Sequence, residues 1–482
     1  MATLEAPPLI IQGGLGAAVS NWFLAKTTAL RGQLGVVSGT GIDTVLVRRL
    51  QDGDVGGHMR RAIERFPIPA AITDVVQKYF QPKGRPDGAQ YKALPLFQAN
   101  VSRARQMLIV LANFVEVHLA KEGHDGPIGI NLLTKIQLPT LASLYGAMLA
   151  GVDYVLMGAG IPREIPGALD RLARHEPAAI KLDVEGLRPG ADAHVEFDPR
   201  ECWTEARTPP PLKRPRFLAI VASNLLATML ARKANGRVDG FVIEGPTAGG
   251  HNAPPRGGTV LNERSEPVYG ERDVVDLERI RELGLPFWVA GGAGSPEALS
   301  ESLAAGAAGI QVGTLFAFCE ESGLEERYKR EILASAREGA VDVITDPRAS
   351  PTGYPFKVVR WPDVPPADRL RARTCDMGYL RTPYQMEDGR IGFRCPAEPV
   401  ECYVAKGGAA QDAAGRQCLC NALMANIGHG QVRAEGKVEP PILTAGDDLR
   451  SLGKFLGGRE RYSARDVIDY LLGEVRGAPA SA

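Results

Sequence analysis

Short apolar runs alternate with longer segments of helical periodicity through the first two thirds of the chain. Strands buried on both faces are almost continuously apolar, whereas a helix that packs on one side is apolar every third or fourth residue. This alternation predicts parallel βα units. The eight candidate strands are Leu9–Gly13, Gly35–Gly39, Ile128–Leu133, Tyr154–Gly158, Phe217–Ala222, Gly240–Glu244, Phe287–Ala290 and Gly309–Gly313.

Three segments between these strands are apolar along one helical face, at Leu138–Ala150, Asn224–Ala234 and Pro296–Ala305. Eight βα units in about 320 residues fit an α/β chain folded as a (β/α)8 TIM barrel with insertions. A doubly wound sheet has the same periodicity. The positions of the glycines favour the barrel, because they follow the strand ends where barrel enzymes build their sites.

The barrel is assigned to residues 1–345, with helical insertions at about 40–126 and 178–216. From residue 346 the βα alternation stops, and proline, glycine and cysteine become frequent. Residues 346–482 are therefore expected to form an additional C-terminal, cysteine-containing region.

Charge and composition exclude several classes of partner. Lys plus Arg and Asp plus Glu both total 56, so the basic surplus that nucleic acids or anionic membranes require is absent. No apolar run reaches a membrane span, and the first residues contain no secretory signal pattern. Five of the seven cysteines follow residue 370, unlike a secreted disulfide framework. A cytoplasmic protein with a small-molecule substrate is predicted.

The most informative segment is GFVIEGPTAGGHNAPPRGG at residues 240–258. Paired glycines let backbone N–H groups approach a ligand closely, because no Cβ intervenes. His251 follows them at the mouth of a strand, and histidine exchanges protons near neutral pH. An isolated motif of this kind is more often an ordinary turn with an exposed histidine.

Two further glycine loops follow the next two strands. Gly291 and Gly292 precede a helix that Ser295 and Pro296 open, and Gly313 and Thr314 directly follow the last strand. Barrels commonly hold a phosphate at such loops, and a helix N-terminus favours an anion. Tight structural turns are the alternative, but the two loops together favour a phosphate site.

These motifs resemble the nitronate monooxygenase (2-nitropropane dioxygenase) family and the related FMN-dependent enoyl-ACP reductases. The likeness rests on EGxxAGGH, on Ala-Gly-Gly one strand later and on the final Gln-x-Gly-Thr. Ile10–Gly14, Gly129–Leu132 and Pro351–Pro355 match in the same order, so that the resemblance covers roughly residues 9–360.

The resemblance implies FMN as the cofactor, at the strand mouths. When the family's residues are carried over by motif, the FMN phosphate is expected to bind Gly291, Gly292, Gly313 and Thr314. The flavin ring and ribityl chain are expected to contact Gly13, Gly14, Asn131 and Gln311, and Gly249 and Gly250 are expected to line the flavin. His251 is implied as the acid/base beside flavin N5. Ser223 is a weaker candidate for a flavin contact, and capping a helix is an equally good explanation for it.

The implied activity is the oxidation of alkyl nitronates with O₂. The first alternative is an NAD(P)H-dependent FMN enoyl-thioester reductase of lipid or polyketide synthesis, and the second is a flavin-binding scaffold without catalysis. A second copy of the chain and an acyl carrier protein remain open as partners.

Three departures separate the chain from the family pattern. The first loop reads Gly13-Gly14-Leu-Gly16 in place of Pro-Met, the first insertion is long, and residues 361–482 lie outside the core family. Within that last stretch Cys375, Cys395, Cys402, Cys418 and Cys420 cluster. Their spacing matches neither zinc knuckles nor ferredoxins, so plain packing is favoured and no metal ligands are assigned.

Overall fold

The protein was analysed as a computed structural model, which describes residues 6–68, 72–203, 209–362 and 371–477. Eight parallel strands close into one barrel in the order β1-β10-β9-β8-β7-β4-β3-β2. The predicted barrel is confirmed, and each predicted strand appears within a residue or so of its expected bounds. The strands are β1 (Ile10–Gln12), β2 (Leu34–Ser38), β3 (Ile128–Leu133), β4 (Tyr154–Gly158), β7 (Arg216–Val221), β8 (Gly240–Glu244), β9 (Phe287–Ala290) and β10 (Gly309–Val312).

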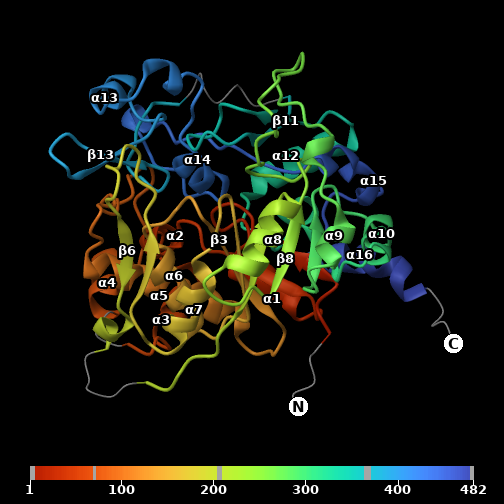
Figure 1. The fold of residues 1–482 in the computed structure, drawn as a ribbon, viewed down its shortest axis with the longest axis horizontal. Helices are drawn as coiled ribbons and strands as arrows, with labels where there is room; N and C mark the ends of the chain where they lie inside the picture. Colours follow the sequence, from red (N-terminus) through yellow and green to blue (C-terminus); the bar gives the residue numbers. More distant parts are fainter. Residues whose placement is uncertain (1–5, 69–71, 204–208, 363–370, 478–482) are drawn as a thin grey trace.

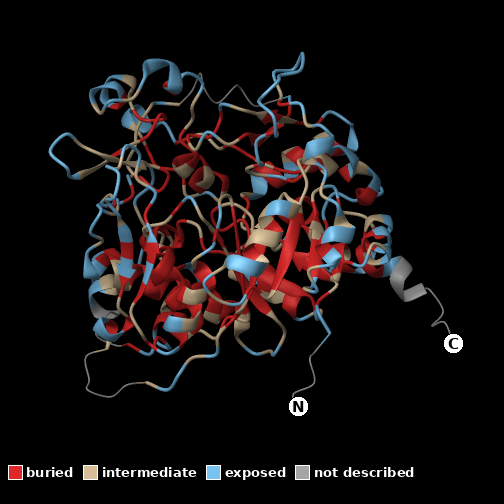
Figure 2. Cartoon of the chain, viewed as in Figure 1, coloured by how far each residue is buried: buried red, intermediate tan, exposed pale blue. Residues whose placement is uncertain are grey.

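The barrel interior is a packed core of alternating inward side chains, including Leu156, Val242 and Trp288. Figure 2 shows this core as the buried centre of the molecule. The helices that follow the strands along the chain pack around the barrel. They are α1 (Trp22–Ala29), α2 (Ile42–Gln51), α6 (Thr140–Leu149), α7 (Ile165–Ala173), α8 (Asn224–Lys233), α9 (Leu277–Arg281), α10 (Pro296–Ala304), α11 (Thr314–Ala317) and α12 (Glu326–Arg337). Of these, α2 and α6 are buried on nearly every side.

The two predicted insertions differ in character. Residues 40–126 contain helices, and the longest of them, α5 (Arg103–Lys121), packs against α6, α1 and α2. The shorter helices α3 (His58–Ile63) and α4 (Ile72–Tyr79) lie before it in the chain. Residues 178–216 contain an antiparallel pair, β5 (Ala178–Lys181) and β6 (His194–Phe197), followed by the 3-10 turn Pro199–Cys202.

The C-terminal region lies over one end of the barrel and also returns along its side (Figure 1). Its elements are the antiparallel pairs β11 (Asp342–Asp346) with β12 (Phe356–Arg360) and β13 (Thr382–Gln385) with β14 (Ile391–Arg394), and the helices α13 (Val400–Ala405), α14 (Leu419–Asn426), α15 (Leu452–Leu456) and α16 (Ala464–Gly477). Helix α16 packs against both α1 and α10, so it covers the seam between the first and last parts of the barrel.

A buried polar network fixes the C-terminal region to the first insertion. The Arg105 guanidinium of α5 lies 2.7 Å from the Asp43 carboxylate of α2. The Tyr379 hydroxyl donates to Asp43 and lies 2.7 Å from the Thr44 hydroxyl. Buried charges of this kind are tolerated only when they are paired and hydrogen-bonded. None of the helices in the described ranges is long and apolar enough to cross a lipid bilayer.

Closure of the barrel requires glycine at position 309, the first residue of β10. A Cβ at this position would lie 2.0 Å from the Leu9 carbonyl oxygen, beside the β1–β10 seam. Because backbone cannot give way cheaply there, Gly309→Ala should destabilise the fold by about 1–3 kcal/mol or more. Thermal unfolding followed by circular dichroism measures this as a lower midpoint.

Gly473→Ala is the matched control for that substitution. Gly473 is exposed in α16 with open space around it, so alanine should leave the midpoint unchanged or raise it slightly. Equal midpoints for Gly309→Ala and the native protein would show that the seam is looser than described.

Candidate functional site

Two adjoining cavities lie at the carboxyl ends of the barrel strands. The first, of about 150 Å³, we call the apolar cavity; it is lined from the barrel by residues including Leu133, Ile136 and Ile220, and from the C-terminal region by Met377, Tyr379, Leu380, Leu419, Cys420, Leu423 and Met424. The second, of about 130 Å³, we call the glycine cavity; its lining includes Gly13, Gly291, Gly292, Gly313, Thr314 and the segment Thr444–Gly446 with Asp448. Gly14, Glu244, Gly249, Gly250 and Gln311 line both.

Glycine is required at several points of this lining. A Cβ on Gly14 would lie 2.2 Å from the Asn131 Cβ, and one on Gly249 would lie 2.8 Å from the Ala445 carbonyl carbon. Gly291 has a φ of 92°, and its Cβ would lie 2.9 Å from the Thr247 hydroxyl oxygen. Side chains at these positions would push the loops apart and fill the cradle, so the loops are built for close backbone approach to a ligand.

Two amide side chains in the site have buried oxygens without a hydrogen-bond donor among the described residues. These are the Asn131 Oδ1 atom on β3 and the Gln311 Oε1 atom on β10. Buried polar atoms are normally satisfied, and an exception in a cavity indicates a ligand that supplies the missing donor. Both residues were predicted to contact the flavin ring or ribityl chain, and both line the apolar cavity.

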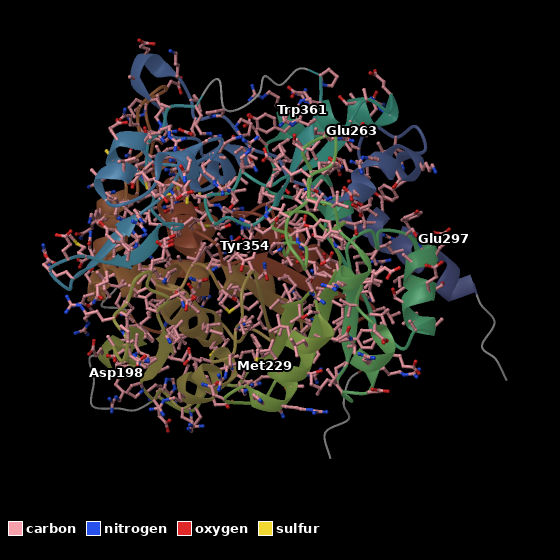
Figure 3. All side chains as sticks on the ribbon, turned by 45° about the horizontal axis from the view of Figure 1, so that its top comes forward. Asp198, Met229, Glu263, Glu297, Tyr354 and Trp361 are labelled. Carbon is pink, nitrogen blue, oxygen red and sulfur yellow. The ribbon has the colours of Figure 1, made fainter. Side chains whose placement is uncertain are left out.

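His251 lies directly after the paired glycines and is held from three sides. Its Nε2 atom is 2.7 Å from the Ser350 hydroxyl, its ring packs edge-on to Phe356 at 4.9 Å, and the ring of Tyr354 lies 6.5 Å away. Tyr354 is labelled near the centre of Figure 3. Burial lowers the pKa of His251 to about 4, because the charged imidazolium loses its solvation. The imidazole is therefore neutral at neutral pH and offers one donor and one acceptor nitrogen.

Glu244, the last residue of β8, is an acid that the sequence analysis did not single out. Its carboxyl group lines both cavities. Burial raises its pKa to about 7, and no hydrogen bond or ion pair joins the carboxyl to another described residue. A carboxyl group in that state exchanges a proton close to neutral pH, which is the property of a functional acid or base.

The segment Thr444–Asp448 of the C-terminal region joins two loops of the barrel, the loop after β8 and the loop after β10. The Thr444 hydroxyl accepts a hydrogen bond from the Gly250 N–H at 2.8 Å. The Gly446 N–H donates to the Thr314 hydroxyl at 2.9 Å, and the Asp447 N–H donates to the Thr247 carbonyl at 2.9 Å. The C-terminal region therefore builds one wall of the glycine cavity.

Asp448 brings a carboxyl group into the same cavity. Thr314 donates its hydroxyl hydrogen to this carboxyl. Burial raises the pKa of Asp448, although the Thr314 hydrogen bond and the Lys357 cation oppose the shift. Because the Thr314 hydroxyl already serves Asp448 and Gly446, only its backbone N–H remains for a ligand.

The structure thus gathers nearly all the predicted site residues. Gly13, Gly14, Asn131, Gly249, Gly250, His251, Gly291, Gly292, Gln311, Gly313 and Thr314 line one or both cavities. Ser223 lines neither; its hydroxyl accepts from the Leu226 N–H and caps α8. Sequence reasoning missed Glu244, Ser350, Asp448 and the apolar wall from the C-terminal region. Glu244 opens the EGxxAGGH motif and Ser350 directly precedes the Pro351–Pro355 match, so both had a signal in the sequence; for Asp448 the signal was the run Thr444-Ala-Gly-Asp-Asp448, which is typical of a turn.

The comparisons with known proteins agree with the motifs. Residues 205–349, a little under a third of the chain, match the model of the nitronate monooxygenase family. The resemblance predicted from the motifs is confirmed over this segment, which contains His251 and the two glycine loops after β9 and β10. The match supports an oxidoreductase of a flavin-dependent kind.

A curated relative from Mycobacterium tuberculosis is (3aS,4S,5R,7aS)-5-hydroxy-7a-methyl-1-oxo-octahydro-1H-indene-4-carboxyl-CoA dehydrogenase. It is 29% identical over 124 residues, which are 26% of this chain and 32% of that protein, so the match spans about a third of the relative's length. FabK from Thermotoga maritima has a similar fold, with a TM-score of 0.50 at 16% identity over 98% of this chain and 94% of that chain.

A nitroalkane oxidase structure from Streptomyces ansochromogenes aligns over 98% of this chain and 96% of its own, at 16% identity and a TM-score of 0.44.

The neutral state of His251 can be measured directly. The Cε1 resonance of His251, in protein labelled with ¹³C at its seven histidines and assigned by its loss in His251→Gln, should stay at its neutral position from about pH 8 to about pH 5. It should move only near the lowered pKa. Since an unfolded histidine takes up its proton near pH 6.5, this residue should also reduce folding stability as the pH falls from that value toward 4.

Titration of the His251 resonance near pH 6.5 would contradict this result, because it would mean that the ring is solvated or that an acid such as Glu244 stabilises its charge.

Proposed function

We propose that this protein is an FMN-dependent oxidoreductase that oxidises alkyl nitronates with O₂. The observation that carries the proposal is the neutral His251 imidazole, held by Ser350 and facing an apolar cavity that adjoins a cradle of glycine loops. The match of residues 205–349 to the nitronate monooxygenase family supports the same conclusion.

The residues present fit a flavin nucleotide. In the proposal, the phosphate binds the backbone N–H groups of the Gly291–Gly292 and Gly313–Thr314 loops. Such N–H groups near helix N-termini suit an anion; α10 begins at Pro296, shortly after the first loop, and α11 begins at Thr314 within the second. Asn131 and Gln311 have the spare amide oxygens that accept from polar groups of a flavin ring or ribityl chain. When bound, the flavin supplies the electron-accepting chemistry, and the protein supplies position and proton control.

In this proposal His251 orients the reacting group of the substrate. A neutral imidazole donates a hydrogen bond to an anionic nitronate oxygen without the cost of a buried cation. If it instead accepts a proton from the neighbouring carbon it becomes a cation, whose charge the anion formed on the substrate offsets. Catalysis also requires that the imidazole ring keep a fixed orientation. The Ser350 hydroxyl, which also contacts the Thr352 hydroxyl at 2.7 Å, fixes that orientation through its hydrogen bond to the ring. Phe356 and the apolar C-terminal wall keep water away and favour an alkyl substituent.

One observation favours a second function. The curated relative is named as a dehydrogenase of a carboxyl-CoA compound, which is a thioester. The alternative is therefore an NAD(P)H-dependent FMN enoyl-thioester reductase, in which His251 protonates or stabilises the enolate. The same residues serve both reactions, so a measurement has to separate them.

The deciding experiment is an anaerobic visible spectrum of the purified protein, followed by additions of NADPH, NADH and an alkyl nitronate. We expect flavin absorption bands that a nicotinamide leaves unchanged, with nitronate turnover once O₂ is admitted. His251→Asn should keep the flavin and lose turnover by about two to four orders of magnitude, because the proton-handling group is gone.

His194→Asn, at an exposed position on β6 away from both cavities, is the matched control and should retain full activity. Rapid bleaching by a nicotinamide would favour the reductase instead. The central proposal would fail if the protein showed no flavin bands after reconstitution with FMN.

Asp448 supplies a separate prediction about cofactor affinity. Its carboxyl lies in the cavity to which we assign the phosphate, so an ionised carboxylate there repels a dianion. Asp448→Asn keeps the shape, removes the charge, and should tighten FMN binding by about tenfold, which is about 1.4 kcal/mol. Quenching of flavin fluorescence gives the dissociation constants.

The ratio of the FMN dissociation constants of the native protein and Asp448→Asn should increase as the pH rises, because the native carboxyl loses its proton while the amide does not. Comparing the two proteins at each pH cancels the titration of the phosphate itself. Asp412→Asn removes an exposed carboxylate elsewhere in the C-terminal region and should leave the affinity unchanged. Weaker binding by Asp448→Asn would instead make Asp448 a group that holds the cofactor loop in place.

A further inference from the structure

Four cysteines from three separate segments gather within the C-terminal region. Cys395 and Cys418 pack together with Ala397 in a small buried cluster, and Cys420 packs against it. Cys375 lies close enough to Cys395 and Cys418 to interact with both electrostatically. Cys402 is exposed on α13 and has no part in the cluster. The fold therefore includes Cys375 and leaves out Cys402, a selection that spacing along the chain does not predict.

Within this cluster Cys418 and Cys420 interact directly. The two thiols are hydrogen-bonded to each other, and the side-chain amide of Asn421 donates to the Cys418 sulfur at 3.5 Å. The Cys420 hydrogen bond lowers the pKa of Cys418 to about 7, while the same contact and burial raise the pKa of Cys420. Cys418 is thus the thiolate of the pair near neutral pH, and thiolates are the nucleophiles of cysteine chemistry.

One member of the pair faces the candidate site. Cys420, together with Leu419 and Leu423, lines the apolar cavity, so a small molecule in that cavity reaches Cys420, which packs against the buried cluster that contains Cys418. Cys418 is the residue before the first turn of α14 and Cys420 lies within that turn. Two residues so spaced have Cα atoms close enough for a disulfide. Among the described residues, no group of three or more His, Cys, Asp or Glu side chains is arranged to hold a metal ion.

We propose that Cys418 and Cys420 are a redox-active dithiol in the wall of the apolar cavity, which a small peroxide oxidises to a disulfide. The Cys418 thiolate attacks one peroxide oxygen and breaks the O–O bond, which forms a sulfenic acid and, after protonation, the first water from hydrogen peroxide. The Cys420 sulfur then displaces the sulfenic hydroxyl, so that the S–S bond forms and a second water leaves. Two thiols lose two electrons and two protons, and hydrogen peroxide is reduced to two waters.

This site does not depend on the proposed nitronate chemistry, because its evidence is the thiol cluster alone. Its consequence for the cavity follows from position. Closing the disulfide moves Cys420, and the wall formed by Leu419 and Leu423 moves with it. Oxidation is therefore expected to change how well a ligand binds in the apolar cavity.

Trypsin offers a direct test, because cleavage after Arg416 and Arg433 releases residues 417–433 with Cys418 and Cys420 as their only cysteines. The folded protein is treated with hydrogen peroxide, denatured, alkylated with iodoacetamide and digested. We expect this peptide to lose both alkyl groups and to be lighter by two hydrogen atoms than the unalkylated dithiol. Without peroxide it should carry two alkyl groups. Oxidation of Met424 adds an oxygen and is distinguished by mass.

Variants identify the order of the steps. Cys420→Ala should leave a sulfenic acid on Cys418 that dimedone traps, whereas Cys418→Ala should abolish trapping on the remaining thiol. Cys402→Ala alters an exposed cysteine outside the cluster and should leave disulfide formation unchanged. The native protein alone decides the matter if a cluster variant fails to fold.

Three outcomes would overturn the proposal. The peptide could keep both alkyl groups after peroxide treatment, or the disulfide could join Cys418 to the peptide that contains Cys375 or Cys395. In the third outcome, the purified protein holds a stoichiometric metal and its thiols react with peroxide only after a chelator removes it.

Discussion

Hydrogen bonds between the segment Thr444–Asp448 and two barrel loops are the interaction on which the site depends. Gly250, Thr247 and Thr314 follow β8 and β10, and each is tied to the same short segment. Loops at strand ends are otherwise the most mobile part of a barrel. The C-terminal region thus fixes the geometry of the loops, and glycine at Gly249 makes the approach possible because any Cβ would collide with Ala445.

Enclosure by this region also sets the protonation states. Covering the strand ends removes water, and the cost of a charge there rises. One cause therefore explains two opposite shifts: the pKa of Glu244 rises to about 7 and that of His251 falls to about 4. Both groups are shifted toward the neutral form. His251 therefore offers hydrogen bonds without a fixed charge, and Glu244 exchanges its proton near neutral pH.

The sequence predicts the barrel well because each βα unit carries its own periodicity. Tyr154–Gly158 and Gly240–Glu244 are apolar runs whose strand character is local, and their bounds match those of the structure. Motif residues such as Gly291 and His251 follow these strands, so the topology brings them together once the barrel closes. Contacts between distant segments have no such local signal. The Asp448–Thr314 hydrogen bond joins residues 134 apart, and the selection of Cys375 over Cys402 follows from how loops cross in space.

The barrel contributes the glycine loops and His251, whereas the C-terminal region contributes much of the apolar wall. The family likeness therefore says more about the chemistry than about the substrate. The segment that matches the nitronate monooxygenase model ends at residue 349, yet Met377, Leu380, Leu423 and Met424 line the apolar cavity. In the proposed function, the side chains that would touch the alkyl part of the substrate therefore lie outside the matched segment. Apolar pockets discriminate by shape, at a cost of about 1–3 kcal/mol for each misfitted methylene. On the proposed function, changes in this wall would alter which substrate fits while the glycine loops and His251 stay the same, so substrate choice and cofactor chemistry would be separable.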